Sequence, residues 1–410
     1  MRRVVITGMG AVTPIGNNVN EFWEGIKSNK CGIDEITAFD TTNFKVKLAA
    51  EVKNLNIDEF LDKKETKRLD RYTQLAIIAS REAMKDSKLN IEEIDKTRFG
   101  VVIGSGIGGL CTIQNCSKVL YEKGPDKVSP MFIPMSISNM AAGNVAIDLG
   151  AKGESFSPTT ACASATHAIG EAFRIIRHGY QDIIVAGGTE ACINELGVSG
   201  FMNIKALHQG TDKNRASIPF DKERSGFVMG EGAGVILLEE LEHAKKRGAK
   251  IYAEIVGYGA TSDAYHVTTP APGGEGGARA MINAIKDANI TPDKITYINA
   301  HGTSTKLNDS GETSAIKNAF GIYSKKVAIS STKGNTGHLL GAAGGVEAIV
   351  CIKAIETGII PPTINYKIPD EECDLDIVPN VLRNQKVTYA MSNSLGFGGH
   401  NSAIIFKEYA

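Results

Sequence analysis

Cys162 is the first residue whose setting suits covalent chemistry. It stands between the small, turn-prone residues 157–161 and a segment, 163–176, whose apolar residues recur every three or four positions. This pattern predicts a sharp turn followed by a buried helix, with Cys162 at the helix N-terminus. The free N–H groups and positive dipole end of a helix favour an anion there, and such settings lower the pKa of a thiol. The alternative is a small buried hydrophobic residue, the usual state of a free cysteine.

Two histidines and a lysine follow predicted buried strands in the second half of the chain. His301 opens the loop 301–305, and Lys333 and His338 lie in one loop further on. Loops of this kind carry catalytic groups in α/β folds. Two neutral imidazoles could both donate an N–H to one oxygen, which suits an enolate or another oxyanion. We expect Lys333 to bias their charge and Glu312 to compensate the lysine.

A zinc site is an alternative reading of these histidines. Zinc needs His, Cys and carboxylate ligands at characteristic spacing, and the sequence shows no such pattern. The seven cysteines are scattered without a CxxC pair. We therefore expect neither a metal site nor a disulfide framework, and we expect a reducing, cytoplasmic location.

Bulk composition excludes several other classes. The 410 residues are 42% hydrophobic, enough for a large core. The formal net charge is -1 with charges of both signs interspersed, so we expect no nucleic-acid partner and no membrane surface. No stretch reaches membrane-spanning length, and the apolar run at the start is too short for a signal peptide.

The elements that must position these residues alternate between strands and helices. Helices are predicted over 20–29, 64–87, 239–248, 275–289, 309–320 and 339–356, and strands over 3–7, 99–103, 182–186, 251–258, 295–300, 327–331, 386–392 and 403–406. Two glycine-rich turns, 8–13 and 104–109, resemble dinucleotide-binding loops. The first has Thr13 in place of the third glycine, and the second lacks an acidic ribose partner, so nucleotide binding is not expected. The pattern predicts an α/β fold with mainly parallel sheets, in two similar halves, 1–250 and 251–410.

Four motifs resemble those of the β-ketoacyl-[acyl-carrier-protein] synthases, and the likeness covers essentially the whole chain. They are Thr159-Thr160-Ala161-Cys162-Ala163-Ser164, His301-Gly302-Thr303-Ser304-Thr305, Ser331-Thr332-Lys333-Gly334-Asn335-Thr336-Gly337-His338 and Gly396-Phe397-Gly398-Gly399-His400-Asn401. The Cys-His-His set is similar to that of the elongating enzymes, whereas the initiating type has Cys-His-Asn. Segments 104–109 and 219–234 look most like synthase II. Lys306 and Gly334-Asn335 depart from the family pattern. They lie in loops near the expected site, so the departures bear on the details of substrate or carrier contact and not on the reaction.

The resemblance implies a thiolase-like αβαβα fold of five layers, usually a homodimer, and an acyltransferase of fatty acid biosynthesis. Cys162 would take an acyl group from an acyl carrier protein thioester. His301 and His338 would support decarboxylation of the malonyl thioester, and the N–H groups of Cys162 and Phe397 would form an oxyanion hole. No cofactor would be required, because loss of CO2 drives the reaction and the substrates are carried on phosphopantetheine.

The resemblance also implies residues around the substrate. Thr303, Thr305 and His266 would contact the pantetheine arm; Ile107, Phe132 and Phe201 would line the acyl pocket, with Phe397 as a gate. Alternatively, the hydroxyls of Thr303 and Thr305 stabilise a turn, and Ile107, Phe132 and Phe201 belong to the ordinary hydrophobic core. Relatives sometimes hold a structural monovalent cation at positions matching Asn299, Glu347, Ser392 and Asn393. A salt bridge would satisfy Glu347 equally well.

A basic group, Lys63, Lys64, Lys67, Arg68 and Arg71, is a candidate docking patch for the acidic carrier, or else a solvated helix face. Two rival functions remain open. One is a polyketide-type ketosynthase, which the absence of attached acyltransferase or carrier segments disfavours. The other is a non-catalytic chain-length partner subunit, which the presence of Cys162 and both histidines disfavours. The sequence does not fix the preferred acyl length.

Overall fold

The computed structural model describes residues 1–410, and its centre is a mixed sheet of ten strands in the order β10-β9-β13-β14-β8-β1-β7-β6-β4-β5. The strands are β1 (Val4–Val12), β4 (Phe99–Gly104), β5 (Ser155–Phe156), β6 (Ile183–Glu190), β7 (Gly232–Glu240), β8 (Ala253–Ser262), β9 (Tyr297–Asn299), β10 (Ala328–Ser330), β13 (Tyr389–Gly396) and β14 (His400–Lys407). Two small ribbons pair β2 (Asp34–Glu35) with β3 (Leu48–Ala49) and β11 (Ile359–Ile360) with β12 (Arg383–Asn384).

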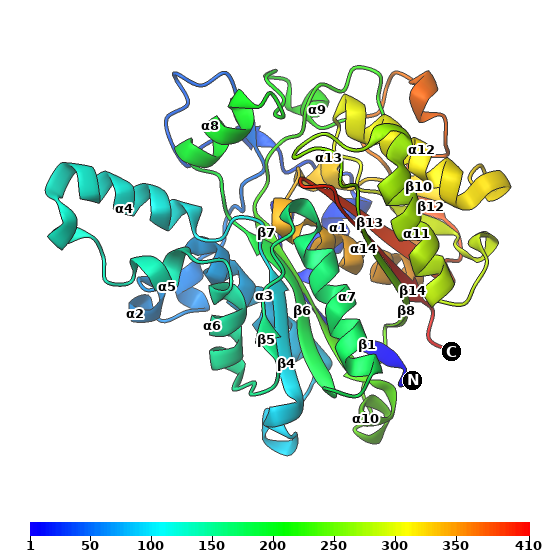
Figure 1. Cartoon of the computed structure of the whole chain (residues 1–410), viewed down its shortest axis with the longest axis horizontal. Coiled ribbons are helices and arrows are strands. Elements are labelled where there is room, and N and C mark those ends of the chain that lie inside the picture. Colours follow the sequence, from blue (N-terminus) through cyan, green and yellow to red (C-terminus); the bar gives the residue numbers. More distant parts are fainter.

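Fourteen α-helices surround and divide the sheet (Figure 1). They are α1 (Val19–Lys27), α2 (Lys63–Thr66), α3 (Arg71–Ser87), α4 (Leu110–Lys123), α5 (Phe132–Ser136), α6 (Met140–Leu149), α7 (Ser164–Arg177), α8 (Glu195–Asn203), α9 (Lys213–Ala216), α10 (Leu241–Lys246), α11 (Glu275–Asp287), α12 (Lys306–Phe320), α13 (Lys333–Thr336) and α14 (Ala343–Thr357). No helix combines the length and the apolar character needed to cross a membrane.

The sheet contains the same five-stranded arrangement twice. In the order β5-β4-β6-β7-β1, the first two pairings are parallel and the next two antiparallel. The order β10-β9-β13-β14-β8 has the same succession of directions and the same order of strands along the chain. The two sets meet where β1 pairs with β8 over only three residue pairs. The chain therefore folds one topology twice.

Packing of the helices gives five layers. α3 packs on β1, β6 and β7, whereas α11 packs on β8, β13 and β14, so these helices cover opposite outer faces. α7 and α14 pack on each other and on strands of both sets, and they form the central layer (Figure 1). The predicted αβαβα fold is confirmed.

The central layer explains why the segment 339–356 is rich in Gly and Ala. Nearly every residue of α14 is buried. A Cβ atom at Gly344 would lie 2.0 Å from Thr166 Oγ1 on α7, and one at Gly345 would lie 2.2 Å from the Gly234 carbonyl on β7. Small residues let this helix approach both a neighbouring helix and a strand.

Two expectations about the elements were wrong. The sheet is mixed, with five antiparallel pairings among nine, because helices cover both faces and a doubly buried strand reads as an apolar run whatever its direction. The helix expected over 64–87 is two helices, α2 and α3. Asp70 begins α3 as an N-cap that accepts a hydrogen bond from the Tyr72 N–H.

Candidate active site

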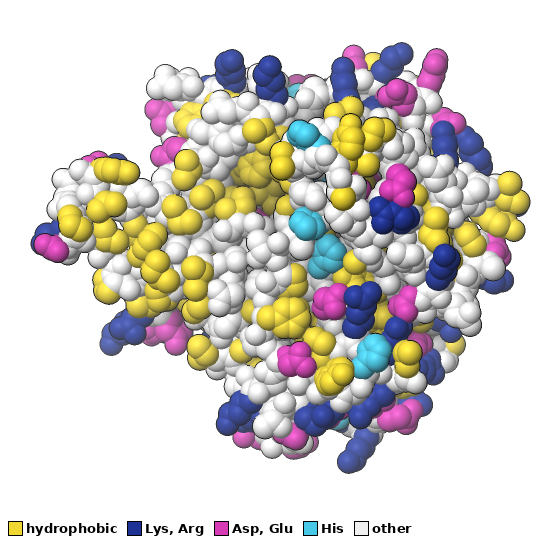
Figure 2. Space-filling view, in the orientation of Figure 1, with side chains coloured by type: hydrophobic (Ala, Val, Ile, Leu, Met, Phe, Trp, Pro, Cys, Tyr) yellow, Lys and Arg dark blue, Asp and Glu magenta, His cyan; other side chains and the backbone are white.

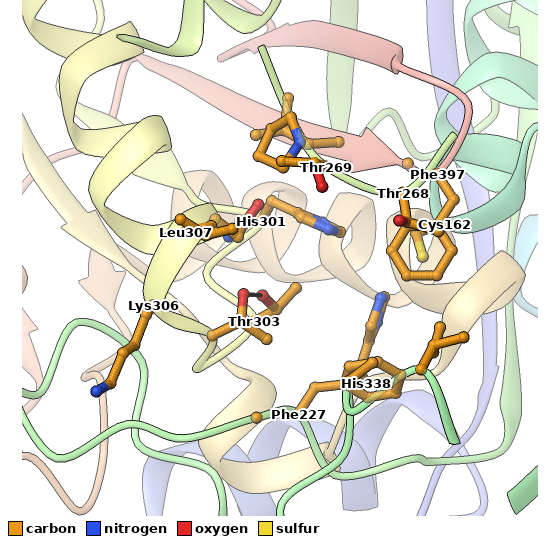
Figure 3. Close-up of a pocket in the computed structure, with 18 of the residues that line it drawn as sticks. Cys162, Phe227, Thr268, Thr269, His301, Thr303, Lys306, Leu307, His338 and Phe397 are labelled. Atoms are coloured by element: carbon orange, nitrogen blue, oxygen red, sulfur yellow. Dashed lines mark hydrogen bonds between the residues drawn. The ribbon is translucent and has the colours of Figure 1, made fainter. Parts of the chain in front are cut away.

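Three of the four predicted catalytic residues meet in one cavity of about 510 Å3, and Lys333 is not part of its lining. Its lining includes Cys162, His301, His338 and Phe397, which come from loops at the ends of four different elements (Figure 3). The Cys162 Sγ and a ring nitrogen from each histidine all lie within 4.8 Å of one another. The side chains that could do chemistry are therefore brought together around one point.

Cys162 sits on a strained turn that leads into α7. It lies in a 3₁₀ turn, Ala161–Ala163, directly before the helix, and Ala161 has a positive φ of 51°. The Ser164 hydroxyl fixes this turn by donating to the Ala161 carbonyl (2.7 Å) and accepting from the Thr160 N–H (2.9 Å). The predicted position of Cys162 on a turn at a helix N-terminus is confirmed.

The expected lowering of the Cys162 pKa was wrong. Burial raises the pKa of this thiol to about 12, against a smaller lowering by the charge of Lys333. A helix terminus stabilises a thiolate, but removing the sulfur from water costs more. Cys162 therefore rests as a thiol and must lose its proton as it reacts.

The helix that follows His338 begins in the same way as α7. A 3₁₀ turn, Leu340–Ala342, precedes α14, and Leu340 has a φ of 49°, close to that of Ala161. α7 and α14 are also the equivalent helices of the two repeats. The repeat thus delivers Cys162 and His338 to one cavity from neighbouring helix N-termini.

Lys333 and Glu347 form a buried ion pair behind the histidines. The Lys333 Nζ also donates to the His301 carbonyl, and both charged side chains are about 2% exposed. The expectation that Glu312 compensates Lys333 was therefore wrong. Glu312 instead accepts from the backbone N–H groups of His301 and Gly302, each at 2.8 Å, and burial raises its pKa to about 7.

Both histidines are neutral. Burial, followed by the charge of Lys333, holds the pKa of His301 and His338 well below the usual value. Their rings meet edge to face, with centroids 5.2 Å apart. Neither nitrogen of His338 has a hydrogen-bond partner, and neither does the Nδ1 of His301. These free nitrogens are able to contact a ligand.

The turn between β13 and β14 brings a backbone N–H to the cavity. Gly398 and Gly399 have φ angles of 84° and 72°, which glycine adopts without strain. The N–H groups of Cys162 and Phe397 donate to no backbone carbonyl. Two such donors on residues that line one cavity match the requirement of an oxyanion hole.

The residues expected around the substrate lie in different places. Thr303, Thr305 and Phe201 line the cavity, and the two threonine hydroxyls are 2.9 Å apart. His266 does not line it. Its Nδ1 accepts from the N–H groups of Thr268 and Thr269, which do line it.

Two of the residues expected in the acyl pocket also lie outside the lining. Ile107 packs against the apolar cluster that contains Cys162, Phe227 and Leu340. Phe132 lies half-buried on α5. The sequence missed Thr268, Thr269 and Pro270, because no motif distinguishes this loop.

Four buried oxygens match the expected cation position. They are Asn299 Oδ1, Glu347 Oε2, Ser392 Oγ and Asn393 Oδ1, and none has a hydrogen-bond partner. Asn299 and Ser392 face each other on paired strands. Buried oxygen donors without partners fit a hard cation. The salt bridge from Lys333 uses the other Glu347 oxygen, so both readings of Glu347 are compatible.

The five basic residues of the candidate docking patch lie in two different settings. Lys63 and Lys64 lie exposed on α2, and Lys67 and Arg68 follow it. Arg71 instead forms a bidentate pair with Glu231, with distances of 2.8 and 2.7 Å. Arg71 therefore belongs to the internal framework and not to a free patch.

Comparisons with known proteins identify the family of the chain. The family profiles described as beta-ketoacyl synthase, N-terminal domain and C-terminal domain match residues 1–244 and 252–367. A Staphylococcus aureus protein named 3-oxoacyl-[acyl-carrier-protein] synthase 2 is 55% identical, covering 100% of this chain and 99% of its own. A Synechocystis protein of the same name is 50% identical, covering 100% and 98%.

Solved structures are similar over the full length. The ishigamide ketosynthase/chain length factor has a TM-score of 0.94 at 34% identity, and a beta-ketoacyl synthase from Burkholderia phymatum has 0.93 at 35%. Each alignment covers 100% of both chains. The chain belongs to the β-ketoacyl synthase family.

Proposed function

We propose that this protein is an elongating 3-oxoacyl-[acyl-carrier-protein] synthase, an acyltransferase that lengthens fatty acyl chains by two carbons. The observation that carries the proposal is the convergence of Cys162 Sγ with nitrogens of two neutral histidines inside one cavity. A nucleophile, two N–H donors and two free backbone N–H groups are the parts that a decarboxylative condensation needs.

The first half of the reaction loads Cys162. Its sulfur attacks the carbonyl carbon of an acyl thioester on the carrier protein, and the Cys162 and Phe397 N–H groups stabilise the tetrahedral oxyanion. As the acyl–Cys162 bond forms, the bond to the pantetheine sulfur breaks. The proton lost by Cys162 leaves with that sulfur as a free thiol, which is consistent with a resting thiol.

The second half forms the carbon–carbon bond. A malonyl thioester on a second carrier loses CO2, and the electrons of the broken bond form an enolate whose oxygen accepts hydrogen bonds from His301 and His338. The enolate carbon attacks the acyl carbonyl, and the bond to Cys162 Sγ breaks. The products are CO2 and a 3-oxoacyl carrier thioester, and the Cys162 thiolate regains a proton. These steps require no separate cofactor.

The carrier's pantetheine arm is proposed to enter past Thr303 and Thr305, whose hydroxyls line the cavity. Phe201 lies against Phe397, with ring centroids 6.3 Å apart, and marks the start of the acyl path. One structural relative is described as a type II polyketide ketosynthase in complex with its acyl carrier protein. That description supports a carrier protein as the partner.

The protein is proposed to act as a cytoplasmic homodimer. Apolar side chains gather over α4, α5, α6 and β5 (Figure 2). The exposed members are Leu120, Tyr121, Ile133, Ile137, Ile147 and Phe156. β5 is also an edge strand, paired only with β4, and an edge bordered by apolar surface favours pairing with a second copy. We call this surface the apolar face.

The polyketide-type ketosynthase is the second candidate, since one structural relative, at 36% identity, is described as a type II PKS ketosynthase with its acyl carrier protein. Identity of 55% to a 3-oxoacyl-[acyl-carrier-protein] synthase favours fatty acid elongation. A non-catalytic partner subunit is disfavoured because Cys162, His301, Lys333 and His338 are all present and assembled.

Intact mass tests the proposal directly. Incubation with an acyl carrier thioester should add one acyl group to the wild type and none to Cys162→Ala, while Cys116→Ala, a change on α4, should behave as wild type. Adding malonyl carrier protein should then discharge the acyl group as a product two carbons longer. No acyl gain on Cys162 would contradict the proposal, and repeated extension without reduction would favour the polyketide reading.

A further inference from the structure

The three side chains at the centre of the cavity form an open metal-binding set as well as a catalytic one. We propose that Cys162, His301 and His338 bind one zinc ion, which occupies the sulfur and reversibly blocks the nucleophile. This inference goes beyond the proposed condensation, which uses no metal.

The geometry is close to that of a three-ligand zinc site. Zn–S bonds of about 2.3 Å and Zn–N bonds of about 2.0 Å place tetrahedral ligand atoms about 3.3–3.6 Å apart. The three ligand atoms here lie within 4.8 Å of one another. Side-chain rotations that draw them together by about 1–1.5 Å complete the site. All three residues line the cavity, so a water molecule is able to reach the ion as its fourth ligand.

The ligand atoms are available to a metal. Both nitrogens of His338 and the Nδ1 of His301 lack hydrogen-bond partners, although these side chains are only 2% exposed. An imidazole nitrogen binds zinc through its lone pair, and no protein group competes for these three nitrogens. Glu347 pairs with Lys333 and offsets part of the lysine charge near the three ligand atoms.

The donor set selects the kind of ion. One thiolate and two imidazoles suit zinc, whereas magnesium and calcium require oxygen ligands. No carboxylate joins the three ligating atoms. On binding, the S–H bond of Cys162 breaks, the sulfur bonds to the metal and the proton passes to solvent. The metal draws electron density from the sulfur, so the bound thiolate is a weaker nucleophile than a free thiolate toward thioesters and alkylating reagents.

A second pair of histidines, His167 and His400, is the other candidate for binding zinc. His167 and His400 have ring centroids 6.5 Å apart. The His167 Nδ1 is already hydrogen-bonded to the Thr160 hydroxyl at 2.8 Å, and no third ligand joins the pair. We therefore expect His400→Ala to leave the zinc site intact.

The test uses the full-length protein with zinc or cobalt salts alone. Equilibrium dialysis should give one Zn2+ per chain, and Co2+ should produce a thiolate-to-metal absorption band that Zn2+ abolishes. At Zn2+ about 100 times its Kd, the rate of Cys162 alkylation by iodoacetamide should fall about 100-fold, and EDTA should restore it.

Variants decide which residues hold the ion. Cys162→Ser and His338→Ala should lose the cobalt band and the bound zinc. Wild-type protein that is folded first and then alkylated at Cys162 should lose both as well, which separates loss of a ligand from misfolding of a variant. Equal zinc binding by alkylated and untreated protein would overturn the proposal, as would unchanged alkylation in zinc or loss of binding in His400→Ala. Acyl loading measured without metal is independent, so failure of either proposal can be told from failure of the other.

Discussion

Lys333 and Glu347 are paired inside the protein, where both side chains are almost fully buried. The lysine also holds the His301 carbonyl, so one buried charge connects α14, the loop of His301 and α13. Removing one member of a buried pair leaves the other charge uncompensated, which is the costly event.

We expect Glu347→Gln to lower the free energy of unfolding by about 3–5 kcal/mol, because it leaves Lys333 charged and buried. Urea denaturation measures the change. Glu356→Gln, which disturbs more exposed pairs with Lys250 and Lys353, is the matched control and should cost about 1 kcal/mol or less. An equal decrease in the free energy of unfolding in the two variants would contradict the prediction that breaking the buried pair is the more costly change.

The Cys162 thiol should show its high pKa in its reactivity. Only the thiolate is alkylated, so in metal-free buffer the iodoacetamide rate should rise about tenfold per pH unit up to about pH 9 without a plateau. Lys333→Met should react more slowly at each pH, because the lysine charge lowers the thiol pKa. The same thiol in urea should level off near its ordinary pKa of about 8.5. A plateau below pH 8 in the native protein would contradict the assignment.

The Phe397 turn should be sensitive to a single methyl group. Gly398 and Gly124 both have a φ of 84°, but a Cβ at Gly398 would lie 3.0 Å from the His400 ring, and one at Gly124 would meet nothing within 4 Å. Both Gly→Ala variants should lose about 1–3 kcal/mol of stability from backbone strain. Only Gly398→Ala should also lose condensation activity, by about 100-fold, because the Phe397 N–H is displaced. Equal kcat/KM in the two variants would contradict this role of the turn.

The apolar face should determine the oligomeric state. Replacing Ile147 and Phe156 together by lysine places two charges on this face and should convert a dimer to a monomer, as read by light scattering after size-exclusion chromatography. Ile322→Lys is the control, because Ile322 is 81% exposed and lies outside the apolar face. A dimer that survives the double substitution would place the interface elsewhere.

The sequence by itself determined the chemistry-bearing residues and the local structure around them. Small residues before Cys162 and helical spacing after it are local signals, and they predicted the turn and helix that the structure contains. Alternating strands and helices indicated the α/β class, and the motifs indicated five layers. The turn, the helix and the α/β class depend on residues close together in the chain, so spacing records them, whereas the five layers followed from the resemblance to the β-ketoacyl synthases.

Only the tertiary structure decided the features that depend on distant residues. Glu347 and Glu312 are both buried acidic residues on helices, and the fold alone pairs the first with Lys333 and the second with backbone N–H groups. Strand direction was mistaken because burial on both faces hides it. The thiol pKa was mistaken because a helix N-terminus is visible in sequence, whereas the loss of water around Cys162 exists only after both halves of the chain have closed over it.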